Sequence, residues 1–334
     1  MTAEYRPDWR PAASTGMLQL RARIVSRLRA FLDNQGVLEV ETPLLSHCAA
    51  TDVHLRSLAT RYTGPGAPGG RTLYLHTSPE YPMKRLLAAG SGSIYQLCKA
   101  FRDGESGRLH NPEFTLLEWY QVGDDHHALM GRIAALVSDA LYGLLDLAPA
   151  ETITYREAFL RYAGVDPFTD AAGLIGWAQR HGIRPPDTAG ALPADDLDGW
   201  RDLVLTHAVE PNLGRGRLVF VHDYPASQAA LACVRPGIPP LAERFELYLE
   251  GMELANGYHE LADARELNRR FDADLERRRV LGLATVPRDE RLLAALAAGL
   301  PDCSGVAIGI DRLIMLAAGV RAIDSVLAFP LERA

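Results

Sequence analysis

Four polar segments interrupt an otherwise apolar sequence, and their residue types could bind a ligand that carries both phosphate and positive charge. The segments span 76–81, 101–120, 253–260 and 305–312. Arg102 and Arg312 lie beside strand-like or glycine-rich sequence, where arginine can bind phosphate oxygens through two parallel hydrogen bonds. The segment 305–312 also predicts a passage from strand to helix, whose backbone can approach a flat ligand closely. We therefore expect a site for a phosphorylated ligand.

Carboxylates form the second part of the pattern. The four in question are Glu80, Glu118, Glu253 and Glu260. Tyr120 lies two residues after Glu118, so on an extended strand the two side chains point to the same face. A pocket lined by several carboxylates and a tyrosine favours a cation, either a divalent metal ion or an amine. Taken singly, each segment is also explained by a surface ion pair, a helix–strand contact or a solvated strand face.

The elements that must position these residues predict an α+β fold. Apolar residues at helical spacing predict helices over 17–34 and 127–145, and an arginine-rich segment predicts a third helix near 264–282. Alternating or apolar runs predict a strand that begins at residue 37 and is stopped by Pro43, and further strands over 72–77 and 218–225. Residues 150–217 predict a helical insertion. Because strands occur early and late without regular βαβ alternation, we expect a mostly antiparallel sheet flanked by helices over 16–334, preceded by an N-terminal arm at 1–15.

Composition excludes several classes of protein. The 334 residues carry a net charge of −7 without a polybasic run, which disfavours a protein that binds nucleic-acid backbone. The apolar runs are shorter than the roughly 20 residues that cross a bilayer, so no membrane partner is expected. The four cysteines form no C-x-x-C pair, which predicts reduced thiols and a cytoplasmic enzyme. We interpret the cysteines and the adjacent pair His126 and His127 as structural or surface residues.

The order of the segments resembles the three motifs of class II aminoacyl-tRNA synthetases. A helix is followed by a strand ending at Pro43, then F-R-x-x-E and H-N-P-E-F-T, and finally G-x-x-x-G-x-D-R. The combination of TSPE, HNPEFTLLEWY, ELANGYHEL and GIDR resembles the lysine branch. The sequence departs from the lysyl-tRNA synthetases in two respects. Only residues 1–15 precede the first motif, so we expect no anticodon-binding domain. Ala307 also replaces the usual middle glycine of motif 3. With FLRYAGVDP, VEPNLG and PASQAAL, these features resemble the elongation factor P–(R)-β-lysine ligase family.

The resemblance implies an ATP-dependent, AMP-forming ligase with a class II synthetase-like catalytic domain. Such an enzyme activates (R)-β-lysine as an adenylate with ATP and Mg²⁺ and attaches it to a lysine of elongation factor P. Arg102 and Arg312 would be the catalytic residues that clamp the triphosphate. The other nucleotide-binding residues would be Gly104, Glu105, Asn111, Phe114, Glu253, Leu254 and Gly309. The amino acid would contact Ser78, Glu80, Glu118, Tyr120, Glu260 and Ala307, and Mg²⁺ would be held by Glu253 and Glu260.

The resemblance also implies partners and leaves alternatives open. The family forms homodimers through motif 1, and the apolar stripe from Met17 to Leu32 is compatible with this, although packing of the stripe on its own core explains it equally well. One alternative is a truncated lysyl-tRNA synthetase or related ligase that charges α-lysine onto another acceptor. We do not expect a tRNA partner, because the negative net charge indicates no basic surface for one. The other alternative is a non-enzymatic paralogue, but Arg102, Glu253 and Arg312 are all present.

Overall fold

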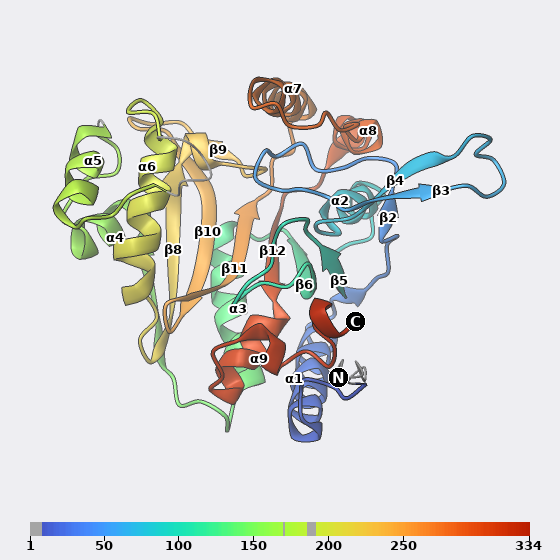
Figure 1. The fold of residues 1–334 in the computed structure, drawn as a ribbon, viewed down its shortest axis with the longest axis horizontal. Coiled ribbons are helices and arrows are strands. Elements are labelled where there is room, and N and C mark those ends of the chain that lie inside the picture. Colours follow the sequence, from blue (N-terminus) through green and yellow to red (C-terminus); the bar gives the residue numbers. More distant parts are fainter. Residues whose placement is uncertain (1–8, 170, 186–191) are drawn as a thin grey trace, which may run out of the picture.

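A mixed, mostly antiparallel sheet forms the centre of the computed structural model, which describes residues 9–169, 171–185 and 192–334 (Figure 1). Within these residues the sheet has nine strands, in the order β1-β5-β6-β12-β11-β10-β8-β7, with β9 paired to β10. Their bounds are β1 Leu38–Glu39, β5 Ile94–Phe101, β6 Glu113–Val122, β7 Ala148–Thr154, β8 Arg217–Pro225, β9 Val234–Arg235, β10 Leu241–Leu249, β11 Met252–His259 and β12 Cys303–Gly309. The parallel pairs, β1 with β5 and β7 with β8, lie at the two edges. The predicted α+β class is confirmed.

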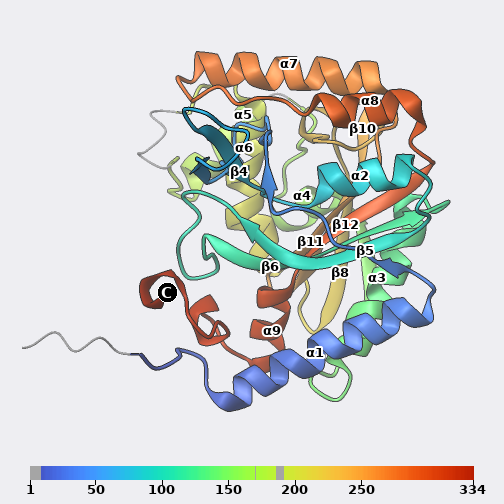
Figure 2. The same ribbon diagram turned by 90° about the vertical axis from the view of Figure 1, so that its right-hand side faces the viewer.

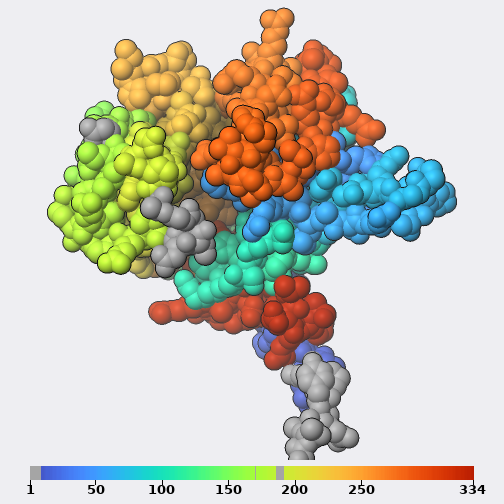
Figure 3. Space-filling view, turned by 45° about the horizontal axis from the view of Figure 1, so that its top comes forward, coloured from blue at the N-terminus to red at the C-terminus, as the bar shows by residue number. Residues whose placement is uncertain are grey.

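A small second sheet extends from one side of the main sheet. It contains β2 (Leu45–Ser46), β3 (Ala59–Tyr62) and β4 (Arg71–Leu75) in the order β2-β4-β3. Figure 3 shows the β3–β4 hairpin projecting from the body of the molecule. The strand that was predicted to stop at Pro43 is β1, and Pro43 lies between it and β2. Proline has no backbone N–H to donate to a neighbouring strand, which accounts for the break.

Helices cover both faces of the main sheet (Figure 2). On one face lie α1 (Thr15–Asn34), α3 (His126–Leu141) and α9 (Ile310–Ala318), and on the other α2 (Glu80–Ala88), α7 (Ala264–Val280) and α8 (Glu290–Gly299). Side chains of Ser14, Asp125 and Asp263 accept hydrogen bonds from the first turns of α1, α3 and α7 and explain where these helices begin. The three predicted helices are confirmed with small shifts at their ends.

The apolar stripe of α1 packs into the core of its own chain. Leu20, Ile24, Leu28 and Leu32 are buried in one cluster with residues of α3, α9 and the sheet. This burial by itself explains the spacing of the stripe. The stripe therefore carries no information about a dimer.

The predicted helical insertion is a helical layer with its own core, preceded by a strand. β7 (Ala148–Thr154) pairs with β8 at the sheet edge, so the first residues of 150–217 are extended rather than helical. Helices α4 (Tyr155–Tyr162), α5 (Ala171–Arg180) and α6 (Leu197–Val204) follow, and residues such as Phe159 and Trp200 pack with the outward face of β8 and β10. Part of the loop between α5 and α6, residues 186–191, lies outside the described residues. Among the helices of the described residues, none is both long enough and apolar enough to cross a membrane.

Candidate active site

Alternation along β6 and β12 directs one set of side chains into a cavity of about 1300 Å³. In the register of the two strands, Glu118 lies opposite Ala307 and Tyr120 opposite Gly305, and all four residues line the cavity. The residues between them, such as Trp119, point to the opposite face and are buried in the core. The strand periodicity thus places polar residues on one face of the sheet and apolar ones on the other.

The predicted site residues divide into two groups along this cavity. The predicted amino-acid residues all line it: Ser78, Glu80, Glu118, Tyr120, Glu260 and Ala307. Eight of the predicted nucleotide residues line it as well: Arg102, Glu105, Asn111, Phe114, Glu253, Leu254, Gly309 and Arg312. Gly104 is the exception, because it lies outside the lining. One continuous space therefore joins two halves. The acidic half is lined by the predicted amino-acid residues, which include Glu80, Glu118 and Glu260, and the other half contains Arg102 and Arg312.

The acidic half holds a buried carboxylate that already accepts hydrogen bonds from two hydroxyl groups. Glu118 is 3% exposed and accepts from Tyr120 OH at 2.8 Å and from Ser78 Oγ at 2.9 and 3.1 Å. The hydrogen bond from Tyr120 OH confirms that Glu118 and Tyr120 point to the same face of β6. Burial, and then the nearby charge of Glu80, raises the pKa of Glu118 to about 8. The side chain therefore gains most from a ligand that brings positive charge.

A buried lysine joins two further carboxylates in this half. Lys84 Nζ lies 2.6 Å from Glu80 Oε1 and 2.6 Å from Glu260 Oε2, and the Lys84 side chain is 2% exposed. Burial opposes the charge, but Glu260 and Glu80 outweigh it and raise the pKa of the Lys84 ammonium above its usual range. The sequence analysis missed Lys84. Its spacing of four residues from Glu80 on α2 was the available signal.

Replacing Lys84 with methionine is expected to lower the free energy of unfolding by about 3–5 kcal/mol, because two buried carboxylates then face each other without a counter-ion. Urea denaturation measures the change. The matched control is Lys99→Met, which removes an exposed pair with Glu113 at 3.4 Å and is expected to cost less than about 1 kcal/mol. Adding Glu260→Gln to the Lys84→Met variant should recover part of the loss. An equal, small loss for Lys84→Met and Lys99→Met would contradict the assignment.

The second half of the cavity contains the two predicted arginines. Arg312 Nη1 donates to the Glu253 carbonyl oxygen at 2.8 Å and to Glu253 Oε2 at 3.3 Å, and Arg312 Nη2 lies 2.7 Å from His110 Nε2. The Arg102 guanidinium lies 5.0 Å from the centre of the Phe114 ring. His110 was quoted as part of the motif but given no role, and its contact with Arg312 could be found only in three dimensions. Two cations and an aromatic face thus border one space.

The loop of motif 2 turns at Gly104. This glycine has φ +81°, and a Cβ on it would lie 2.5 Å from Arg56 Nη2, so a side chain is both strained and crowded there. The turn returns Glu105 toward Arg102, whose Nη1 lies 3.5 Å from Glu105 Oε1. The structure thus gives Gly104 a role in the turn and leaves the acidic side chain at the site to Glu105.

Asn111 and Gly309 position backbone around the same half. The Asn111 amide donates to the Glu113 carbonyl oxygen at 2.6 Å and accepts from the Leu331 N–H at 3.1 Å, so it holds the motif 2 loop against the C-terminal segment. Gly309 precedes α9, and a Cβ on it would lie 3.7 Å from the Leu254 carbonyl oxygen. The Asn111 hydrogen bonds thus hold one wall of the cavity next to the arginines, and Gly309 keeps the wall at the start of α9 free of a side chain.

The structure separates the two carboxylates that were predicted to share Mg²⁺. Glu253 and Glu260 lie at opposite ends of β11, about 20 Å apart along an extended strand, and Glu260 is paired with Lys84. They cannot bind one ion together. The carboxylates near Glu253 are instead Glu246 and Glu210. Burial, followed by the charges of Glu246 and Glu253, raises the pKa of Glu210 to about 7, and burial followed by the charge of Glu246 raises the pKa of Glu253. This group could not be predicted from residue spacing, because Glu210 belongs to the helical insertion.

The chain matches one known protein family over nearly its full length, and the similar proteins share one name. Residues 3–333 match the family described as tRNA synthetases class II (D, K and N). A protein of Vibrio cholerae named elongation factor P–(R)-beta-lysine ligase is 50% identical over 331 residues, which are 98% of this chain and 99% of the relative. Proteins of the same name from Pectobacterium atrosepticum and Salmonella typhi are 50% and 48% identical, each over 98% of both chains. The similarity thus extends over nearly the full length of each relative.

Proposed function

Because the chain belongs to the class II tRNA synthetases of the D, K and N group, and among them to the elongation factor P–(R)-β-lysine ligases, we infer that it is the ligase that modifies elongation factor P. It activates (R)-β-lysine with ATP and transfers the β-lysyl group to a lysine side chain of elongation factor P. The predicted family, enzyme class and reaction are confirmed by the relatives.

The charge balance of the acidic half carries the assignment of the amino acid. Glu80, Glu118 and Glu260 bring three negative charges when ionised, and Lys84 neutralises one of them. The two charges that remain match the two ammonium groups of β-lysine. A buried pocket of this sign rejects acidic and neutral amino acids, because either would leave buried carboxylates without partners.

In the first step, the substrate carboxylate attacks the α-phosphorus of ATP. The new oxygen–phosphorus bond forms as the bond between the α- and β-phosphates breaks, and pyrophosphate leaves. Arg102 and Arg312 border the space that the triphosphate would fill and would stabilise the charge that grows on its oxygens. Phe114 offers a face on which adenine can stack. Positioning and charge stabilisation suffice here, so the chain needs no nucleophile of its own.

In the second step, the side-chain amine of the acceptor lysine attacks the acyl carbon of the adenylate. The amide bond forms, AMP leaves, and the amine gives up a proton. The cavity must admit a side chain carried by a protein, and its volume of about 1300 Å³ exceeds what the adenylate alone requires. Elongation factor P therefore approaches from the open side of the cavity.

The group around Glu253 is suited to Mg²⁺. Glu253 lies between Arg312 and two neighbouring carboxylates, Glu246 and Glu210, and all three line the cavity. Oxygen-only ligands next to a triphosphate are what Mg²⁺ prefers. The ion would neutralise charge on the phosphates. Glu253, helped by Glu210, would hold it, and Glu260 would serve the amino acid instead.

The amino-acid contacts follow from the acidic half. Ser78 and Glu80 would face one amine of (R)-β-lysine, and Tyr120 with Glu260 would face the ε-ammonium. Ala307 adds a methyl group to the wall opposite Glu118, where a glycine would leave more room. This methyl group reduces the space next to the reacting end of the substrate, so the site distinguishes between α- and β-amino acids, whose backbones differ in length.

Affinity for (R)-β-lysine is expected to rise between pH 6 and pH 8. Without substrate, Glu118 holds a proton below about pH 8, and binding an ammonium group requires its release. Each pH unit below this value should weaken binding by up to about tenfold, because one proton is lost on binding. Calorimetric titration at several pH values measures the slope. Glu118→Gln should bind more weakly with a flatter profile, and an unchanged slope in that variant would contradict the role of Glu118.

A homodimer and a cytoplasmic location are part of this proposal. Leu38, Leu44 and Leu45, in the segment after α1, are 55%, 38% and 45% exposed, which is unusual for apolar residues next to a sheet edge and suits a contact with a second copy. Sedimentation velocity of the chain and of a Leu38→Glu/Leu45→Glu variant tests the dimer, and a monomer before substitution would contradict it.

The cysteines support the cytoplasmic location. All four are free, as in proteins of reducing compartments.

Exchange of labelled pyrophosphate into ATP tests the activation step. The rate of exchange catalysed by the purified chain is measured with (R)-β-lysine, with L-α-lysine and without an amino acid. The proposal predicts strong exchange with (R)-β-lysine and only background without an amino acid. A preference for α-lysine together with charging of tRNA would point instead to a minimal lysyl-tRNA synthetase. Absence of exchange with every amine would indicate a paralogue without activity.

A further inference from the structure

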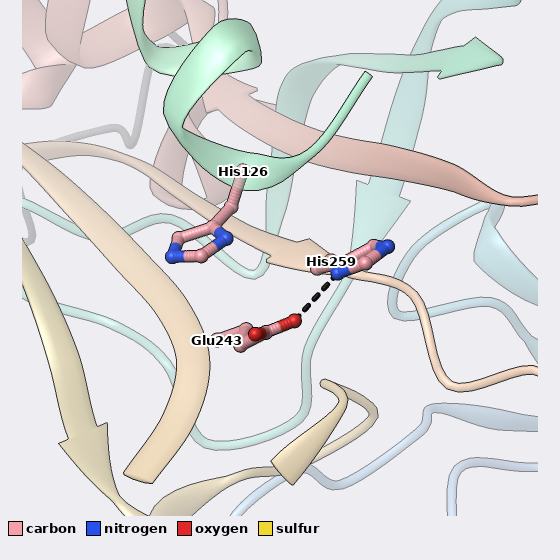
Figure 4. A group of neighbouring side chains, drawn as sticks. All are labelled: His126, Glu243 and His259. Carbon is pink, nitrogen blue, oxygen red and sulfur yellow. Dashed lines mark hydrogen bonds and ion pairs between the residues drawn. The ribbon is translucent and has the colours of Figure 1, made fainter. Parts of the chain in front are cut away.

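A second polar cluster lies on the face of the sheet opposite the cavity. Along β11, Tyr258 and Glu260 line the cavity, so His259 between them points to the face covered by α3. His126, the first residue of α3, and Glu243, at the start of β10, extend toward the same point (Figure 4). Helix α3 and the two strands of the β10–β11 hairpin thus bring together two imidazoles and a carboxylate.

The three side chains have the spacing of a site that can close around an ion. Their ligand atoms all lie within 4.8 Å of one another. His259 Nδ1 lies 2.5 Å from Glu243 Oε2, and its other nitrogen, Nε2, lies 2.7 Å from Asp302 Oδ1. In metal sites, the second nitrogen of a ligating histidine usually donates to a carboxylate, which fixes the ring and its tautomer. Asp302 occupies that place here.

His126 is the member of the cluster that lacks a hydrogen bond. It is 2% exposed, and neither of its ring nitrogens has a partner among the described residues. An unpaired buried imidazole is costly unless something binds it.

We propose that His126, Glu243 and His259 form a site for Zn²⁺, with a water molecule as the fourth ligand. Two imidazole nitrogens and one carboxylate oxygen form a three-residue ligand set that zinc accepts, whereas Mg²⁺ and Ca²⁺ prefer oxygen alone. Metal–ligand bonds of about 2.1 Å at tetrahedral angles place ligand atoms about 3.4 Å apart. On binding an ion, His259 Nδ1 and Glu243 Oε2 would move apart from 2.5 Å to that spacing, and the His126 ring, which has no hydrogen bond to lose, would turn toward them.

A bound ion would join the start of α3 to β10 and β11 directly behind the acidic half of the cavity. Ser304 Oγ already donates to the Asp124 carbonyl oxygen at 3.0 Å and holds the preceding loop against β12. The ion would add a second connection on the other side of that loop. Its expected effect is on stability, and the ligase reaction needs no ligand from this cluster.

Metal binding to the untagged full chain tests the site. Zinc content is measured after purification without chelators, and Co²⁺ is titrated into the chelator-treated protein while its visible absorption is recorded. We expect one ion per chain, the absorption of four-coordinate Co²⁺, and a rise in Tm on adding Zn²⁺ of about 2–5 °C. His126→Gln should weaken Co²⁺ binding at least about 100-fold. The matched control, His127→Gln, changes the exposed neighbouring histidine and should bind as the unmodified chain does.

Two results would overturn the proposal. Equal Co²⁺ binding by the unmodified chain and by His126→Gln would show that other histidines bind the ion. Absence of Zn²⁺ and Co²⁺ binding would show that His259, Glu243 and Asp302 form an ion-pair network only. Because His126 has no hydrogen bond to lose, its variant should fold, and an unchanged circular dichroism spectrum verifies this before titration.

Discussion

Replacing Arg312 with alanine is expected to lower the rate of adenylate formation about 10³-fold. Arg312 is one of the two predicted catalytic arginines that line the cavity, and it holds the Glu253 side chain by a contact of 3.3 Å. Its removal takes away charge stabilisation in the transition state and leaves the carboxylates of Glu253 and Glu210 to repel the nucleotide. Both effects act in the same direction, so the loss should appear in kcat as well as in the KM for ATP.

The measurement is pyrophosphate exchange with (R)-β-lysine at saturating ATP. The matched control is Arg279→Ala, because Arg279 is exposed on α7 and its ion pair with Glu276 lies outside the cavity. That variant should retain activity within about twofold of the unmodified chain. A loss of less than tenfold for Arg312→Ala, with the fold intact, would remove Arg312 from the catalytic residues.

Gly305→Ala should abolish use of the amino acid while sparing ATP binding. A Cβ at this position would lie 2.4 Å from Glu260 Oε1 and 2.4 Å from Tyr120 Cε1. Neither neighbour can move freely, because Tyr120 is 2% exposed and Glu260 is paired with Lys84. We expect a drop of at least about 100-fold in kcat/KM for (R)-β-lysine, since small displacements of a bound substrate cost that much.

Two measurements separate this effect from loss of folding. Binding of a non-hydrolysable ATP analogue should stay within about twofold, because Gly305 lies in the acidic half of the cavity. The control Gly131→Ala adds the same methyl group on α3, where no atom lies within 4 Å, and should leave activity unchanged. Full activity of Gly305→Ala would contradict the placement of the amino acid between Tyr120 and Glu260.

Much of the fold could be predicted because its signals are periodic. The helical spacing from Met17 to Leu32 corresponds to α1, and Glu118 and Tyr120, two residues apart, lie on one face of β6 as predicted for an extended strand. In both cases a local pattern determines which face is buried. The α+β class followed from the arrangement of such segments along the chain.

The parts that could not be predicted depend on contacts between distant elements. Lys84 looks like an ordinary helix residue until α2 places it between Glu80 and Glu260. Glu210 joins Glu253 only because the insertion folds back over β10 and β11. The opposite error concerned Glu253 and Glu260, which are close in sequence but far apart on an extended strand. Sequence spacing reports distance only when the element between two residues is known.

The most direct test of the central claim is the mass of elongation factor P after reaction. The purified chain is incubated with elongation factor P, ATP, Mg²⁺ and (R)-β-lysine, and the intact factor and its peptides are analysed by mass spectrometry. We predict an ATP-dependent gain of one β-lysyl group on a single lysine, absent with Arg312→Ala. An unchanged factor, under conditions in which pyrophosphate exchange with (R)-β-lysine proceeds, would contradict the claim that elongation factor P is the acceptor.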